Sequence, residues 1–177
     1  LRFWLGMKNE EIADALGISD ADLVAAVAEL EPAEHRLQIL RPPGGAIVID
    51  DSYNSNPRAL MKMIDVLSGI PSFVRRILVA GEMLELGKDS DAMHFECGTY
   101  AASRQLDMVI GIQGAAQEIV RAAWKSGMPD TQACFFDSAD AAADFLRSGL
   151  RKGDLVLVKG SRGVHTEKIL QSLRLRF

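Results

Sequence analysis

The chain has 177 residues, 48% of them hydrophobic and 25% charged, a balance typical of a folded protein rather than a disordered one. Its formal net charge of -4 argues against the basic surface that nucleic-acid binding needs. The apolar runs are shorter than the roughly 18 residues of a membrane helix, no signal peptide is recognisable, and the two cysteines, Cys97 and Cys134, make no disulfide framework. We therefore expect a reduced, cytoplasmic protein that binds neither membrane nor nucleic acid.

The first part of the chain is predicted to be helical. Residues 9–30 read as two helices separated by a turn at Gly17, with Ser19 as the N-cap of the second helix. The pair resembles a helix-turn-helix, but residues 20–31 carry four acidic side chains and no basic one. DNA would repel such a helix, so we interpret the pair as structural.

From residue 36 onward, short apolar strands alternate with helices. The strands are predicted at 37–40, 46–49, 77–80, 108–111, 133–136 and 155–158, and the helices at 59–67, 92–103, 115–124, 139–146 and 164–173. Continuous apolar strands followed by helices predict a three-layer α/β fold, with a Rossmann-like, mostly parallel sheet covered on both faces. Ligands of such sheets bind beyond the carboxyl ends of the strands, so the loops at those ends are the candidate sites.

The loop after the second predicted strand is crowded with polar groups. It reads Asp50-Asp51-Ser52-Tyr53-Asn54-Ser55-Asn56-Pro57, and Pro57 suits the first turn of the next helix. A simple turn in which Ser55 or Asn56 caps that helix would account for one of these residues. It would not account for two carboxylates, an aromatic ring and two amides, so we predict a functional loop.

Two further loops follow predicted strands. Lys159-Gly160-Ser161-Arg162-Gly163 precedes a helix and could bind an anion, although a solvated basic turn is the alternative. The loop at 81–90, taken by itself, is interpreted as a connecting loop. For His94, which follows it, a packing role is favoured over a catalytic one. The glycine and lysine spacing of a P-loop occurs nowhere in the sequence.

The polar loop at 50–57 resembles that of the Mur ligases of cell-wall synthesis. In the member that adds D-Ala-D-Ala the loop reads Asp-Asp-Ser-Tyr-Asn-Ala-Asn-Pro, so only Ser55 differs. The likeness extends to Gly81-Glu82-Met83-Leu84-Glu85-Leu86-Gly87, to His94, to the run at 157–162 and to Arg36-Leu37-Gln38. These motifs span residues 34–175 in the order and spacing of the family.

The resemblance implies a particular division of the chain. Residues 34–177 would form the C-terminal domain, and residues 1–33 would be a helical remnant of the central ATP-binding domain. The N-terminal domain and most of the central domain, with its P-loop and Mg²⁺ sites, would be missing. The apolar start at residues 1–5 is then expected to pack on the central domain, and the chain alone is expected to be inactive.

The activity implied is that of an ATP-dependent acid–amino-acid ligase of peptidoglycan synthesis, and so of cell shape and division. Such an enzyme joins D-Ala-D-Ala to UDP-MurNAc-tripeptide through an acyl phosphate. Arg36 would approach the ATP phosphates and Asp51 the ribose hydroxyls. The nucleotide contacts implied are Arg36, Asp51, Tyr53 and Asn54, and the substrate contacts are Asn56, Glu82, Lys159, Ser161 and Arg162. No residue of this chain is assigned a catalytic or metal-binding role.

Two alternatives remain open at this stage. Within the enzyme class, the chain could come from another Mur ligase or from a ligase like folylpolyglutamate synthetase; the Tyr-Asn-Ser-Asn-Pro run favours the D-Ala-D-Ala-adding member. Outside it, the chain could be a stand-alone α/β module that binds a small anion through Lys159 and Arg162.

Overall fold

A computed structural model describes residues 16–28 and 33–174. The chain divides into two compact units, Leu1–Pro32 and Ala33–Phe177. In the first unit, helix α3 (Asp20–Ala28) is present as predicted, and the Ser19 hydroxyl accepts a hydrogen bond from the Asp22 N–H at 3.2 Å. Ser19 therefore caps this helix. The other predicted helix and the apolar start lie outside the described residues.

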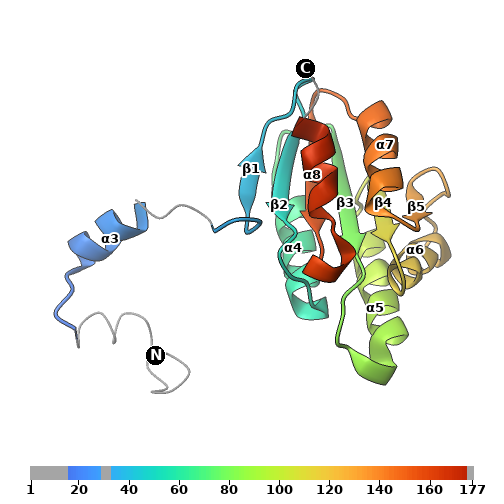
Figure 1. Ribbon diagram of the computed structural model, residues 1–177, viewed down its shortest axis with the longest axis horizontal. Coiled ribbons are helices and arrows are strands. Elements are labelled where there is room, and N and C mark those ends of the chain that lie inside the picture. Colours follow the sequence, from blue (N-terminus) through green and yellow to red (C-terminus); the bar gives the residue numbers. More distant parts are fainter. Residues whose placement is uncertain (1–15, 29–32, 175–177) are drawn as a thin grey trace. The chain divides into compact units, whose positions relative to one another are not determined.

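Within residues 33–174 the chain forms a six-stranded sheet (Figure 1). Its strands are β1 (Gln38–Leu40), β2 (Ile47–Asp51), β3 (Arg75–Gly81), β4 (Met108–Ile112), β5 (Ala133–Phe136) and β6 (Asp154–Lys159). Their spatial order is β1-β2-β6-β3-β4-β5, antiparallel between β1 and β2 and parallel elsewhere. The predicted strands and the mostly parallel sheet are confirmed.

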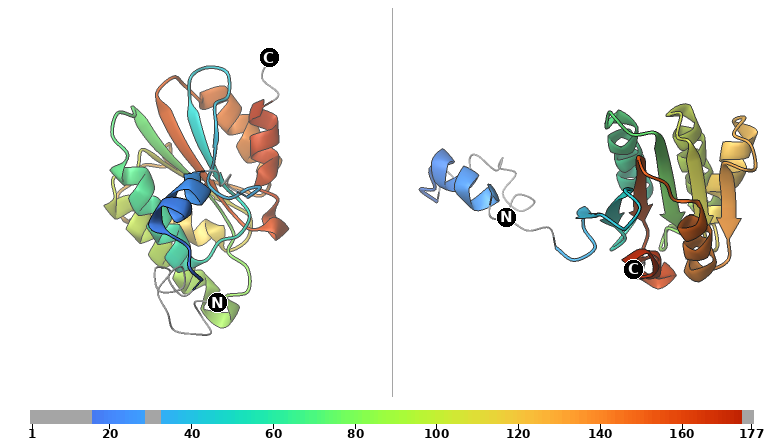
Figure 2. Two further views of the ribbon diagram at one scale, coloured as in Figure 1. Left: turned by 90° about the vertical axis from the view of Figure 1, so that its left-hand side faces the viewer. Right: turned by 90° about the horizontal axis from the view of Figure 1, so that it is seen from above.

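The helices lie on both faces of the sheet, as predicted. They are α4 (Pro57–Gly69), α5 (Ser90–Ser103), α6 (Ala116–Lys125), α7 (Ala139–Gly149) and α8 (Glu167–Arg174). The first three cover one face, and α7 and α8 cover the other (Figure 2, right). Helix α8 begins three residues later than predicted, because a 3-10 turn, η2 (Arg162–Val164), comes first and His165 is left-handed at φ 56°. A left-handed residue cannot continue a right-handed helix.

Burial on both faces explains why the strands read as unbroken apolar runs. Leu78 and Leu157 belong to the core under α4, α5 and α6. Their chain neighbours Val79 and Val158 point the other way, into the core under α7 and α8. All four side chains are fully buried, as strands of a doubly covered sheet require. None of the helices in the described ranges is both long and apolar enough to cross a membrane.

The two cysteines should differ in reactivity. Cys97 is fully buried on α5, and burial raises the pKa of its thiol to about 12. Burial also raises the pKa of Cys134, but its side chain is only partly buried. Because the thiolate is the reactive form, we expect iodoacetamide at about pH 8 to modify Cys134 slowly and to leave Cys97 unmodified until the chain unfolds. Mass spectrometry of peptides labelled with and without denaturant would measure this. Equal labelling of both thiols in the folded chain would contradict the prediction.

Candidate functional site

Three loops converge where parallel strands β2, β6 and β3 end. Asp51, the last residue of β2, pairs in register with Lys159, the last residue of β6, and Lys159 pairs with Ala80 near the end of β3. The loops that follow are therefore neighbours in space, although the first and the last are about a hundred residues apart in the chain. This is the edge of a parallel sheet at which ligands bind.

Asp51 and Lys159 form a nearly buried ion pair at this edge. The Lys159 ammonium lies 2.6 Å from the Asp51 carboxylate and donates a second hydrogen bond, of 2.9 Å, to the Asn54 carbonyl oxygen. The Lys159 side chain is 3% exposed and that of Asp51 15%. Lys159 thus holds the loop after β2 in place, and its charge is compensated within the protein. It was predicted to contact substrate; the structure places it with the residues assigned to the nucleotide.

Tyr53 carries two guanidinium groups over its ring. The Cζ of Arg36 lies 4.2 Å from the ring centroid, and that of Arg162 lies 4.6 Å from it. Such stacking orients a guanidinium while leaving its N–H groups available to an anion. The structure thus brings together Arg36, from the start of the second unit, and Arg162, from turn η2.

An open cleft of about 330 Å³ lies beside this stack. Its lining residues are Tyr53, Asn54, Leu84, Glu85, Ser161, Arg162 and Gly163. Four of the predicted site residues line it, and they come from two of the three converging loops. Glu85 and Leu84 come from the loop after β3. The sequence had indicated that loop as functional only through its resemblance to the Mur ligase motif at residues 81–87.

Glu82 is not among the residues that line this cleft, and its carboxylate is bonded at the start of helix α6. Its Oε1 accepts a hydrogen bond of 2.9 Å from the Ala115 N–H, at the start of α6. Gly114 makes room for it, since a Cβ at that position would lie 2.2 Å from the carboxylate. The Glu82 carbonyl oxygen accepts a hydrogen bond of 2.9 Å from the Ser161 hydroxyl. Glu82 thus joins the loops after β3, β4 and β6.

Asn56 and His94 have structural partners. The Asn56 side-chain oxygen accepts a hydrogen bond of 2.9 Å from the Ala59 N–H, so Asn56 caps α4 as the simpler interpretation predicted. His94 is fully buried; its Nε2 accepts from the Met83 N–H at 2.9 Å, and its Nδ1 lies 2.7 Å from the Ser90 carbonyl oxygen. This geometry requires the neutral imidazole with its proton on Nδ1. The prediction of a satisfied packing residue is confirmed.

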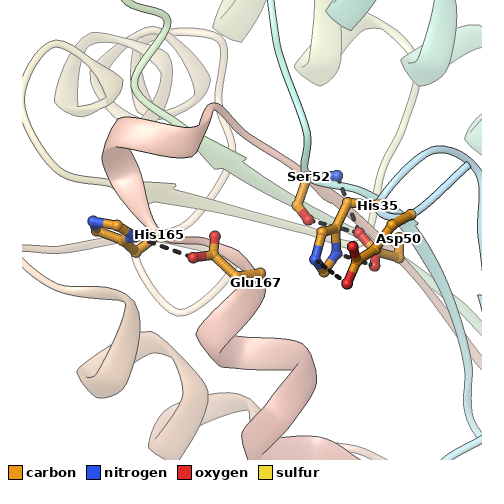
Figure 3. A network of polar contacts seen from close by, with 6 residues as sticks. His35, Asp50, Ser52, His165 and Glu167 are labelled. Carbon is orange, nitrogen blue, oxygen red and sulfur yellow. Dashed lines mark hydrogen bonds and ion pairs between the residues drawn. The ribbon is translucent and has the colours of Figure 1, made fainter.

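Sequence reasoning missed two residues of this region, Asp50 and His35. Asp50 is fully buried, and its carboxylate is bonded both to Ser52 and to the His35 imidazole (Figure 3). Alternation along a strand points Asp50 and Asp51 to opposite sides. That pattern could have indicated that the two adjacent carboxylates do different things. His35 carried no local signal.

The described part of the chain, residues 16–28 and 33–174, holds no group of three or more His, Cys, Asp or Glu side chains arranged to bind a metal.

Comparison with known proteins gives consistent matches. Residues 35–162 match the family described as Mur ligase, glutamate ligase domain. The UDP-N-acetylmuramoyl-tripeptide--D-alanyl-D-alanine ligase of Bacillus subtilis is 28% identical over 157 residues, which are 89% of this chain and 34% of that protein. The ligase of the same name from Mycobacterium tuberculosis is 32% identical over 181 residues, covering 92% of this chain and 35% of that protein.

A solved structure agrees with these matches. The crystal structure of the MurF ligase of Thermotoga maritima in complex with ADP has a TM-score of 0.73 at 28% identity, over 92% of this chain and 35% of that one. The chain thus spans about a third of the length of the proteins it matches.

Proposed function

This chain belongs to the Mur ligase family, and we propose that residues 34–177 are the C-terminal domain of an ATP-dependent ligase that joins D-Ala-D-Ala to UDP-MurNAc-tripeptide in peptidoglycan synthesis. The observation that carries the proposal is the convergence of the loops after β2, β6 and β3 on one cleft. These loops contain the motifs of the family, and the relatives with that name match across nearly the whole chain. Residues 1–33 would be the end of the central ATP-binding domain.

The nucleotide would lie at the Tyr53 stack. A guanidinium binds phosphate oxygens through two parallel N–H donors, so Arg36 and Arg162 suit the phosphates of ATP. Asp51 would accept hydrogen bonds from the ribose hydroxyls, and its bond to Lys159 holds the carboxylate in one orientation. The similarity to a ligase solved with ADP supports the use of a nucleotide by this family member. ATP would supply the phosphoryl group that converts the tripeptide carboxylate to an acyl phosphate.

The acceptor dipeptide would lie beside the loop after β6. Lys159 and Glu82 are bonded within the protein, so among the predicted substrate contacts Ser161 and Arg162 are those that line the cleft. Arg162 could bind either the dipeptide carboxylate or the phosphate that forms beside it. Catalysis would then depend on positioning and charge neutralisation when the domains close around the substrates. The other domains of the full-length ligase would hold Mg²⁺, and a reaction that uses ATP and a UDP-sugar would take place in the cytoplasm.

A comparison of acceptors tests the proposal. The full-length protein that contains this segment should release ADP only when UDP-MurNAc-tripeptide and D-Ala-D-Ala are both present. L-Ala, D-Glu or diaminopimelate should not replace the dipeptide. A folate together with glutamate should not replace the two substrates. The 177-residue chain alone should show no turnover with any of them. ADP release with D-Glu or with folate and glutamate would favour the other ligases of this fold. Turnover by the isolated chain would contradict the proposed division of the active site.

A further inference from the structure

A buried carboxylate ties the start of the second unit to the end of β2. The Oδ2 of Asp50 lies 2.8 Å from the Nδ1 of His35. Its Oδ1 accepts hydrogen bonds from the Ser52 N–H at 3.1 Å and from the Ser52 hydroxyl at 2.7 Å. Figure 3 shows the His35 ring and Ser52 next to the Asp50 carboxylate. The carboxylate has only acceptors, so His35 must donate its Nδ1 proton.

The main chain makes a second tie between the same two segments. The Tyr53 N–H donates a hydrogen bond of 3.1 Å to the His35 carbonyl oxygen. His35 itself is left-handed, with φ at 59°. A residue other than glycine rarely adopts that backbone conformation unless other contacts hold it there. Here the bond to Asp50 and the bond from Tyr53 are those contacts.

The residue after each tied partner belongs to the candidate site. Arg36 follows His35, and Tyr53 follows Ser52, and these two residues make the stack of 4.2 Å. The tie therefore determines where both halves of the stack lie. It is not a nucleophilic triad, because the Ser52 hydroxyl donates to Asp50 and not to the imidazole.

We propose that Asp50 and His35 are positioning residues, which hold Arg36 against Tyr53 so that its guanidinium is directed at the ATP phosphates. This inference rests on the proposed function, in which Arg36 contacts the nucleotide. Asp50 and His35 touch neither substrate nor ATP. They act through the backbone of the segment at residues 35–37, which lies just after the boundary between the two units.

A pair of substitutions of equal shape separates the tie from a general structural role. In His35→Asn the side-chain Nδ2 takes the place of the imidazole Nδ1 and still donates to Asp50. In His35→Asp the same position holds an oxygen that repels the carboxylate. Asn and Asp both tolerate the left-handed conformation. In the full-length ligase we expect His35→Asp to raise KM for ATP at least tenfold while KM for D-Ala-D-Ala stays within twofold. His35→Asn should stay within threefold of the unsubstituted enzyme for both.

His165 offers a matched control. It is also left-handed, at φ 56°, and its Nδ1 lies 3.0 Å from the Glu167 carboxylate, but its side chain is 62% exposed. Figure 3 shows this pair beside the buried one. Solvent screens exposed charges, so His165→Asp should leave both KM values unchanged.

Amide hydrogen exchange in the 177-residue chain tests the His35–Asp50 contact without any measurement of enzyme activity. The Tyr53 N–H should exchange at least tenfold faster in His35→Asp than in His35→Asn. If the full-length enzyme does not use D-Ala-D-Ala, the proposed function fails, and this exchange rate alone decides whether the tie exists. Equal exchange and equal KM for ATP in the Asn and Asp variants would overturn the inference. So would an equal rise of both KM values in His35→Asp.

Discussion

Asp51→Ala in the full-length ligase should lower kcat/KM for ATP by roughly a hundredfold, the size expected when a hydrogen-bonding carboxylate is lost from a bound nucleotide. It should also destabilise the domain. Lys159 is 3% exposed. Without Asp51, the one hydrogen bond of its ammonium that remains among those the structure describes is the bond to the Asn54 carbonyl oxygen. An uncompensated buried charge costs about 3 kcal/mol. Steady-state kinetics at varied ATP and urea unfolding of the 177-residue chain measure the two effects separately.

The double variant Asp51→Ala/Lys159→Met separates the two losses. Removing the buried ammonium together with its partner should restore most of the free energy of unfolding, because no charge is left unpaired. It should not restore ATP use, because the carboxylate is still absent. If the double variant recovered kcat/KM for ATP, Asp51 would act only by neutralising Lys159, and the proposed ribose contact would be wrong.

Asp154→Ala should lower the free energy of unfolding by about 3 kcal/mol, a large part of the roughly 5 to 15 kcal/mol typical of a domain. Asp154 begins β6 and is 1% exposed. Its carboxylate accepts hydrogen bonds from the Arg75 Nε at 2.8 Å, from the Arg75 Nη2 at 2.6 Å and from the Arg151 N–H at 2.7 Å. The bond also raises the pKa of Arg75, and a guanidinium stays charged at neutral pH even without a partner, so Asp154→Ala leaves that charge unpaired. Urea unfolding of the 177-residue chain measures the change.

Asp144→Ala is the matched control for this prediction. Asp144 also pairs with an arginine, Arg147, but both side chains are exposed on α7. Exposed pairs contribute little, so the change should stay within about 0.5 kcal/mol. Asp154 lies at the opposite ends of the strands from the cleft, so kcat of the full-length enzyme should be unchanged where Asp154→Ala is still folded. Equal destabilisation by the two substitutions would show that burial of the Arg75 pair is not what matters.

Local patterns in the sequence were sufficient for the elements of the second unit. Apolar runs without alternation predicted each strand, and the polar loop at 50–57 stood out because so many hydrogen-bonding side chains follow a buried strand. Asn56 and Pro57 indicated where α4 begins, because helix capping depends on residues only a few positions apart. The family resemblance came from the same short motifs. All of these signals act over a few residues, which is why the sequence alone conveys them.

The order of the strands was decided only by the tertiary structure. Strand β6 comes last in the chain but lies between β2 and β3, and no local pattern specifies which parallel strands pair. That order puts Lys159, which was predicted to contact substrate, in a nearly buried ion pair with Asp51, 108 residues away. The tertiary structure likewise brings the Glu82 carboxylate to the Ala115 N–H at the start of α6.

The sequence by itself therefore determined the fold class, the elements and the loops that form the candidate site of this protein. The tertiary structure decided which charged groups face the cleft and which are bonded inside the protein. His35 and Asp50 make the difference plain, since nothing near either residue in the chain indicates the other. The physical reason is that a side chain's charge is set by its type, whereas its partner is set by long-range packing, which brings together residues that share no local pattern.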